Sequence, residues 1–129
     1  MDRRVCAFSL VELVVAIAVI GVLAAMAYPA YVSQVIKGNR AAAQQFMLDI
    51  ANGQAQYQLD TRAYANVIGA GGLGFAPPQS TLTNYTFSIG LTAGPPPRYV
   101  ITATPVGRQA QDGVLTLDSA GNKTPVSKW

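Results

Sequence analysis

Residues 8–36 read FSLVELVVAIAVIGVLAAMAYPAYVSQVI, an apolar run with a single charge, that of Glu12. Coiled as an α-helix, the uncharged residues 13–36 span about 36 Å at about 1.5 Å per residue. That length crosses a hydrocarbon core of about 30 Å. Arg3 and Arg4 precede the run, and basic residues stay on the cytoplasmic side of a membrane helix. The sequence therefore predicts a membrane-crossing helix that leaves the rest of the chain on the outside.

Glu12 separates two interpretations of this helix. In the first, the helix is an ordinary signal peptide cut after the small residues 25–27 (Ala-Met-Ala), which would release a soluble periplasmic protein. An acid inside a membrane helix costs about 2.5–3.5 kcal/mol on insertion scales, and a disposable signal gains nothing from it. Such an acid more often marks contact with a partner.

A partner for Glu12 follows if the chain is cut between Ala7 and Phe8. The new α-amino group of Phe8 would then lie just over one helical turn from Glu12. In a bundle of identical helices, this ammonium could pair with the carboxylate of a neighbour, because a buried charge is tolerated when it is paired. We therefore predict that Glu12 sets the axial register in which these helices assemble.

The residues around this expected cut carry a family resemblance. Residues 8–15 (Phe-Ser-Leu-Val-Glu-Leu-Val-Val) resemble the prepilin motif of type IV pilins and pseudopilins, with the acid at the fifth position after the cut. The resemblance implies a leader peptide of residues 1–7, cleavage between Ala7 and Phe8 by a prepilin peptidase, and N-methylation of Phe8. The chain departs from the family at Ala7, where glycine is usual.

Gly21 and Pro29 place two poor helix formers in the apolar run, at costs of about 1 and 3 kcal/mol relative to alanine. Pro29 also removes a backbone donor and favours a kink. In related pilins a proline at this place bends the stem, and the stretch between the glycine and the proline can lose helicity in the filament. The resemblance implies that residues 21–29 let the packed stem bend or stretch; the alternative is a tolerated kink without a role.

The helix is predicted to continue past Ile36 into a globular head of residues 37–129. An apolar face recurs at steps of three and four; it is formed by Ala43, Phe46, Met47, Ile50, Gln54 and Tyr57. Arg40 and other polar residues fall mostly off this face. A helix from Phe8 to its expected end near Leu59 would be about 78 Å long.

The remainder of the head is predicted to be a loop followed by strands. Residues 60–82 form the expected flexible loop, in which residues 69–74 (Gly-Ala-Gly-Gly-Leu-Gly) match a dinucleotide-binding pattern. We reject that match, because the fingerprint must follow a strand and open a helix. Strands are predicted from alternation and turn signals, at 85–91, 98–104, 114–118 and 123–126. The predicted fold class is α+β, with the second half of the long helix packed on a small antiparallel sheet.

The head also resembles the small PilE-like pilins. Residues 57–65 match their entry into the loop, residues 99–105 their second strand, and residues 115–123 with Trp129 their last hairpin. Such pilins commonly close the C-terminal segment with a disulfide, whereas the only cysteine here is Cys6, in the expected leader. The head is therefore expected to rely on sheet packing, with Trp129 anchoring its end.

Composition excludes several kinds of function. The chain has no histidine and one cysteine, so a zinc site, a Cys-His nucleophile pair and an internal disulfide are excluded. We expect no enzyme activity, no catalytic residue, no cofactor and no metal. The net charge is +3 and the basic residues of the head are scattered in the sequence, so DNA is a partner that the sequence allows without supporting it.

The predicted function is that of a structural subunit of a type IV pilus, held in the inner membrane as a precursor and then assembled into an extracellular fimbrium. The implied partners are the prepilin peptidase, the pilus assembly machinery, and copies or relatives of the chain in the filament. Adhesion, twitching motility and DNA uptake all stay open. The alternative is a type II secretion pseudopilin. It is disfavoured because Asp112 and Asp118, the only acids after Asp60, are too few for the calcium loop common there.

Overall fold

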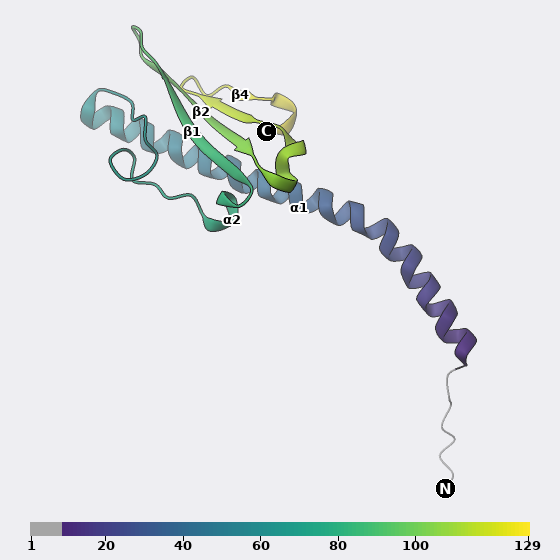
Figure 1. Cartoon of the computed structure of the whole chain (residues 1–129). Helices are drawn as coiled ribbons and strands as arrows, with labels where there is room; N and C mark the ends of the chain where they lie inside the picture. Colours follow the sequence, from purple (N-terminus) through teal and green to yellow (C-terminus); the bar gives the residue numbers. More distant parts are fainter. Residues whose placement is uncertain (1–8) are drawn as a thin grey trace. The chain divides into compact units, whose positions relative to one another are not determined.

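The computed structural model describes residues 9–129 (Figure 1). In chain order the elements are α1 (Leu10–Thr61), α2 (Gln79–Leu82), β1 (Tyr85–Thr92), β2 (Arg98–Pro105), the 3₁₀-helix η1 (Gly107–Asp112), β3 (Leu115–Asp118), β4 (Lys123–Thr124) and the 3₁₀-helix η2 (Val126–Lys128). The chain divides into two compact units, a stem unit ending at Val35 and a head unit from Ile36 to Trp129. The predicted α+β class, with a long N-terminal helix and an antiparallel sheet, is confirmed.

Helix α1 runs without a break past its predicted end at Leu59 and stops at Thr61. The next residue, Arg62, has a φ of 58°, the left-handed conformation that commonly closes a helix and that glycine usually supplies. The Arg62 amide donates to the carbonyl of Gln58 at 2.9 Å, and the Thr61 hydroxyl donates to the carbonyl of Tyr57 at 2.7 Å. These bonds satisfy carbonyls that the end of the helix would leave without partners.

The four strands form one antiparallel sheet in the order β1-β2-β3-β4. The pairing aligns Ile89 with Ile101 and Ile101 with Leu117, so apolar side chains from three strands share one face. The predicted strands are confirmed with small shifts at their ends. The last was predicted too long: β4 covers only Lys123–Thr124, and Pro125, which has no amide hydrogen to donate, leads into η2.

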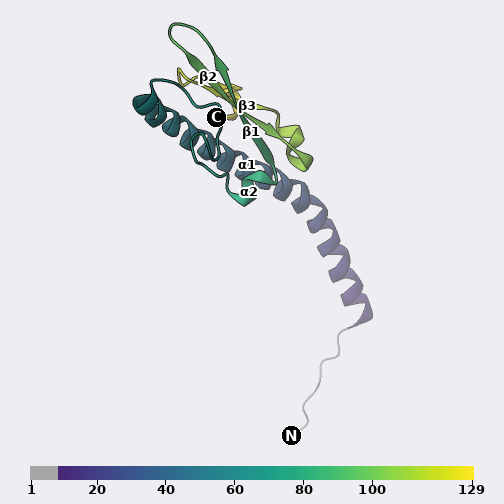
Figure 2. The same cartoon turned by 60° about the vertical axis from the view of Figure 1, so that its left-hand side comes forward.

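The core of the head unit lies between this sheet and the C-terminal part of α1, as both views show (Figures 1 and 2). The predicted helical face is buried at Ala43, Phe46, Met47, Ile50 and Gln54, while Tyr57 is half-buried. It meets the buried sheet residues Tyr85, Tyr99, Ile101, Ala103, Leu115 and Leu117. The rings of Phe46 and Phe87 stack edge to face with centroids 4.9 Å apart. Each large side chain buried here contributes about 1.5–3 kcal/mol.

The segment between α1 and β1 differs from the predicted unstructured loop. Residues 79–82 form the short helix α2, and the glycine-rich turn before it is closed by backbone hydrogen bonds. The Leu73 amide donates to Val67 at 3.0 Å and the Phe75 amide donates to Ile68 at 2.8 Å. Ile68, Leu73 and Phe75 pack against the core, so apolar side chains hold the segment in place. The glycine-rich turn neither follows a strand nor opens a helix, as the rejected dinucleotide match would require.

Gly53 is the place where this segment comes closest to α1. A methyl group at Gly53 would lie 2.2 Å from the Phe75 ring, whereas Gly38, in the same helix, has open space around it. We expect Gly53→Ala to lower the free energy of unfolding by about 1–3 kcal/mol, because the ring must move. The matched Gly38→Ala should raise it by about 0.5–1 kcal/mol through helix propensity. Urea unfolding of the two variants tests this, and equal effects of the same sign would contradict it.

Candidate functional site

The surface of the stem unit is apolar and uncovered. Every large apolar side chain from Leu10 to Leu23 is more than half exposed. Within residues 9–129, α1 is long and apolar enough to cross a membrane, with a mean hydropathy of 2.7 in its span and none of that span buried. Exposed apolar surface of this extent marks contact with a membrane or with other chains.

Glu12 lies in the first turn of α1, where the helix dipole favours an anion. Within the described residues 9–129, no cationic side chain pairs with it. The predicted cleavage site at Ala7 and Phe8, and the predicted methylation of Phe8, lie outside the described residues. The pairing of Glu12 with a neighbouring chain end therefore stays a prediction.

Gly21 and Pro29 both lie inside α1, and the helix continues through each of them. Gly21 has no atom near the position that a side chain would take. A shallow apolar groove of about 340 Å³ lies elsewhere on the same helix, lined by Val15, Ala18, Val19, Val22 and Leu23. The bending role predicted for Gly21 and Pro29 is a property of the packed filament and stays a prediction.

A polar cluster, unexpected from the sequence, joins η1 to α1 in the head unit. Asp112, at the end of η1, is 3 % exposed. Its carboxylate accepts hydrogen bonds from the Arg40 guanidinium, including one from Nε at 2.9 Å, and from the Tyr85 hydroxyl at 2.5 Å. Gln109 completes the cluster: its amide Nε2 donates to the Tyr85 oxygen at 3.0 Å and to the backbone carbonyl of Ile36 at 2.9 Å.

The pKa values of this cluster follow from its contacts. Burial alone would raise the pKa of Asp112, but the hydrogen bonds from Arg40 and Tyr85 outweigh it and lower the pKa to about 2. Burial, together with the bond to Asp112, raises the pKa of Tyr85 well above its ordinary value. The bond to Asp112 also raises the pKa of Arg40. At neutral pH, Asp112 is therefore a buried carboxylate held ionised by its partners.

The C-terminal segment is held to α1 and to the last strand without a disulfide. Gln44 on α1 donates from Nε2 to the carbonyl of Lys128 at 2.7 Å. The Trp129 ring packs against the core, and the Lys123 ammonium lies 4.8 Å from its centroid. Lys128 also places its ammonium 3.8 Å from Asp112. The predicted anchoring by Trp129 is confirmed, and it is shared with Gln44.

A groove opens at the end of the head unit where β2 begins. Its smaller part, of about 380 Å³, is lined by residues 62–64, 91–93, Pro97 and Arg98 and contains no acid. An adjoining part of about 580 Å³ shares Tyr64 and Arg98 and includes Asp118. Tyr64 is braced by an edge-to-face contact with Tyr99, at 4.8 Å between centroids. Among the described residues, no carboxylate lies within ion-pair distance of Arg62 or Arg98.

Sequence reasoning missed the polar cluster and the groove for different reasons. It placed Arg40 off the buried face, whereas Arg40 is half-buried and paired with Asp112. The available signal was Tyr85, which shares the apolar face of the alternating residues 85–91 with Phe87. A tyrosine hydroxyl that is buried on such a face needs a hydrogen-bond partner. Arg62 and Arg98 are far apart in the sequence, and only the loop geometry brings them to one groove.

Comparison with known families gives two matches. A family model described as "Type IV minor pilin ComP, DNA uptake sequence receptor" matches residues 29–117. A second, described as "Prokaryotic N-terminal methylation motif", matches residues 2–28. No curated protein matches the chain.

Proposed function

The chain belongs to the type IV minor pilin family, and from that premise we propose how it becomes part of a pilus. It is made as an inner-membrane precursor, with residues 1–7 as leader, 8–36 as membrane and filament-core helix, and 37–129 as head. The prepilin peptidase cuts between Ala7 and Phe8 and methylates the new amino group. The mature subunit then leaves the membrane and enters an extracellular filament.

The observation that carries this proposal is the uncovered apolar stem with one acid in its first turn. Such a surface needs lipid before assembly and neighbouring stems after it. The groove lined by Val15, Val19 and Val22 on the stem is apolar and of a size to receive side chains from another helix. The match of residues 2–28 to the N-terminal methylation motif supports processing at Phe8.

The proposed role of Glu12 is to pair, in the filament core, with the methylated amino group of Phe8 in a neighbouring subunit. A carboxylate buried among apolar stems costs several kcal/mol when it is alone. An ammonium group near it offsets that cost, and only cleavage creates this group at Phe8. The proposal thus links processing to assembly: an uncut precursor lacks the cation that Glu12 needs.

Mass spectrometry of the mature protein's N-terminus tests this processing step. We expect N-methylated Phe8 as the first residue in chains recovered from filaments. A first residue of Tyr28 would instead indicate a soluble protein released from a signal peptide, and an uncut Met1 in filaments would contradict the proposed pairing. Recovery from sheared surface filaments, as opposed to secretion complexes, separates a pilin from a pseudopilin.

The family is described as a DNA uptake sequence receptor, and this description favours a second role for the chain, contact with DNA. We propose that the groove at Arg62 and Arg98 contacts the phosphate backbone. Arg62 and Arg98 both line the smaller part of the groove together with Tyr64, whose ring suits contact with a base or a sugar. Asp118, in the adjoining part, is already engaged by the Ala120 and Asn122 amides, so phosphate is expected at the acid-free side.

Removing both groove cations should lower the affinity for DNA and should also reduce the dependence of that affinity on salt. For Arg62→Gln with Arg98→Gln, each lost phosphate contact should flatten the slope of log affinity against log salt by about 0.9 for a duplex. Fluorescence anisotropy of the mature chain in detergent, titrated at several salt concentrations, measures this. Arg108→Gln, at the other end of β2, is the control; an equal effect of that change would place the DNA elsewhere.

A further inference from the structure

The charge of the head unit is concentrated at one end. Arg40 and Lys128 lie within ion-pair distance of Asp112, Arg108 precedes Gln109 in η1, and Lys37 follows Ile36, whose carbonyl Gln109 binds. We call these four cations the basal cluster. The other cations of the head unit, Arg62, Arg98 and Lys123, are matched in number by Asp49, Asp60 and Asp118. Counting side chains, the net positive charge of the head unit therefore lies in the basal cluster.

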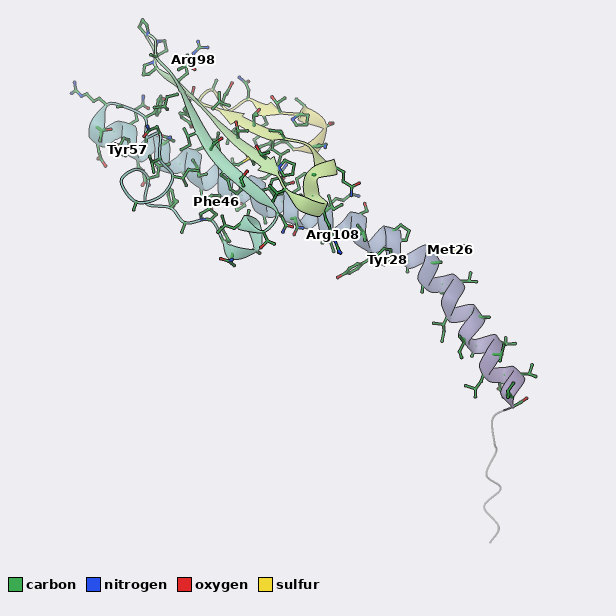
Figure 3. The ribbon with its side chains drawn as sticks, viewed as in Figure 1. Met26, Tyr28, Phe46, Tyr57, Arg98 and Arg108 are labelled. Atoms are coloured by element: carbon green, nitrogen blue, oxygen red, sulfur yellow. The ribbon has the colours of Figure 1, made fainter. Side chains whose placement is uncertain are left out.

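The basal cluster is fixed at the residue where the uncharged run ends. Gln109 donates to the carbonyl of Ile36 at 2.9 Å, and Asn39 donates to Gln109 at 3.2 Å, so η1 is fastened to the start of the head unit. Lys37 follows Ile36 and Arg108 precedes Gln109, and both side chains are exposed. Arg108 and Arg98 lie at opposite ends of the sheet (Figure 3).

We propose that the basal cluster binds the anionic phosphate headgroups of the bilayer from which the precursor's helix emerges. This inference rests on the proposed membrane-held precursor and adds a second, reversible contact to the apolar anchor. Lys37 is one residue beyond the uncharged run, so a helix that spans the bilayer brings it to the level of the headgroups. Arg108 is carried to the same level by the Gln109 bond to Ile36.

The one acid in this region does not oppose the contact. Asp112 is buried and bound by Arg40, Tyr85 and Gln109, so it presents no free carboxylate to a phosphate. Cations near an anionic membrane surface each favour binding by about fivefold at physiological salt. The attraction falls off within a Debye length of about 8 Å, so it acts on cations close to the headgroups, such as one directly after the membrane-crossing run. Lipid is favoured over DNA here because Lys37 directly follows the uncharged run that the proposal places in the bilayer.

The test uses the full chain in lipid nanodiscs with and without phosphatidylglycerol in a phosphatidylcholine background. A fluorophore on Gln111→Cys in a Cys6→Ser background reports the position of η1, since Gln111 is exposed and outside the hydrogen-bonded cluster. Nitroxide labels on lipid headgroups quench it when η1 lies at the surface. We expect stronger quenching with phosphatidylglycerol, which added salt reverses.

The Lys37→Gln, Arg108→Gln double variant should reduce the ratio of docked to undocked heads about 25-fold, from two cations at about fivefold each. The Arg62→Gln, Arg98→Gln variant, which removes the same charge from the DNA-contacting groove proposed above, should keep the parent chain's dependence of quenching on phosphatidylglycerol. The inference is overturned if quenching does not depend on phosphatidylglycerol, or if the Lys37→Gln, Arg108→Gln variant is quenched as strongly as the parent chain. Displacement of the docked head by duplex DNA that persists in the Arg62→Gln, Arg98→Gln variant would assign the basal cluster to nucleic acid instead.

Failure of the underlying membrane proposal gives a separate result. A chain that does not float with the lipid, or that alkaline carbonate extracts from it, lacks the anchor itself, and the inference falls with it. A chain that floats and resists extraction but shows no dependence on lipid charge retains the anchor and overturns only the headgroup contact.

Discussion

Glu12→Ala is expected to leave the chain in the membrane and to reduce its entry into filaments more than a hundredfold. The stem that carries Glu12 is apolar and exposed, so its packing into a filament surrounds the carboxylate with apolar side chains. Removing one member of a buried ion pair costs about 3–5 kcal/mol, because the other charge is left without compensation. In the alanine variant, the charge left without a partner is the proposed ammonium of Phe8 in a neighbouring subunit.

Membrane insertion should not suffer in this variant, because replacing the acid removes an insertion cost of about 2.5–3.5 kcal/mol. The ratio of chain in sheared filaments to chain in the inner membrane, measured by immunoblotting, reports assembly independently of expression. Ser9→Ala changes the residue directly before α1 without changing the charge and serves as the matched control. Glu12→Asp keeps the charge and should give an intermediate yield. A normal yield from Glu12→Ala would contradict the pairing.

Asp112→Ala is expected to lower the free energy of unfolding of the head by about 3–5 kcal/mol. The change removes the acceptor of the fully buried Tyr85 hydroxyl and the partner of the Arg40 guanidinium. A buried donor without a partner costs about 1–3 kcal/mol by itself. It also releases η1 from α1 on one side, leaving the hydrogen bonds that join Gln109 to Ile36 and to Asn39.

Urea unfolding of the mature chain, followed by the fluorescence of Trp129, the chain's single tryptophan, measures this loss. Asp60→Ala removes an exposed acid and is the matched control, with an expected effect within about 0.5 kcal/mol. If the two variants unfold alike, the polar cluster is not a major support of the head.

Asp112 also makes the free energy of unfolding of the head depend on pH under acidic conditions. The pKa of Asp112 is lowered in the folded head from an ordinary 3.8 to about 2, so its contribution to stability is complete above about pH 4. It is lost as the pH falls through about 2, and the shift corresponds to about 2 kcal/mol. Asp112→Asn should abolish this part of the acid response. Parallel acid profiles for the parent and Asp112→Asn would contradict the assignment.

The elements read correctly from the sequence were those with a strong local period. The face of α1 from Ala43 to Gln54 and the alternation along β1 and β2 each follow from side-chain spacing alone. Short elements were missed: α2 and η1 cover four and six residues, too few for a period to stand out from the surrounding loop. Residues 123–126 were predicted as one strand, but the ladder stops at Thr124 because Pro125 cannot continue it.

The sequence by itself determined that this chain has an apolar stem with an acid in its first turn, an amphipathic continuation of the helix, and a family motif around Phe8. These are properties of neighbouring residues, and a helix converts their spacing directly into a face. Only the tertiary structure decided that Arg40 meets Asp112, that Arg62 and Arg98 share a groove, and that Lys37 and Arg108 stand at one end of the head. Those pairs are separated by many residues, so their meeting depends on how the sheet packs on the helix, which no local pattern records.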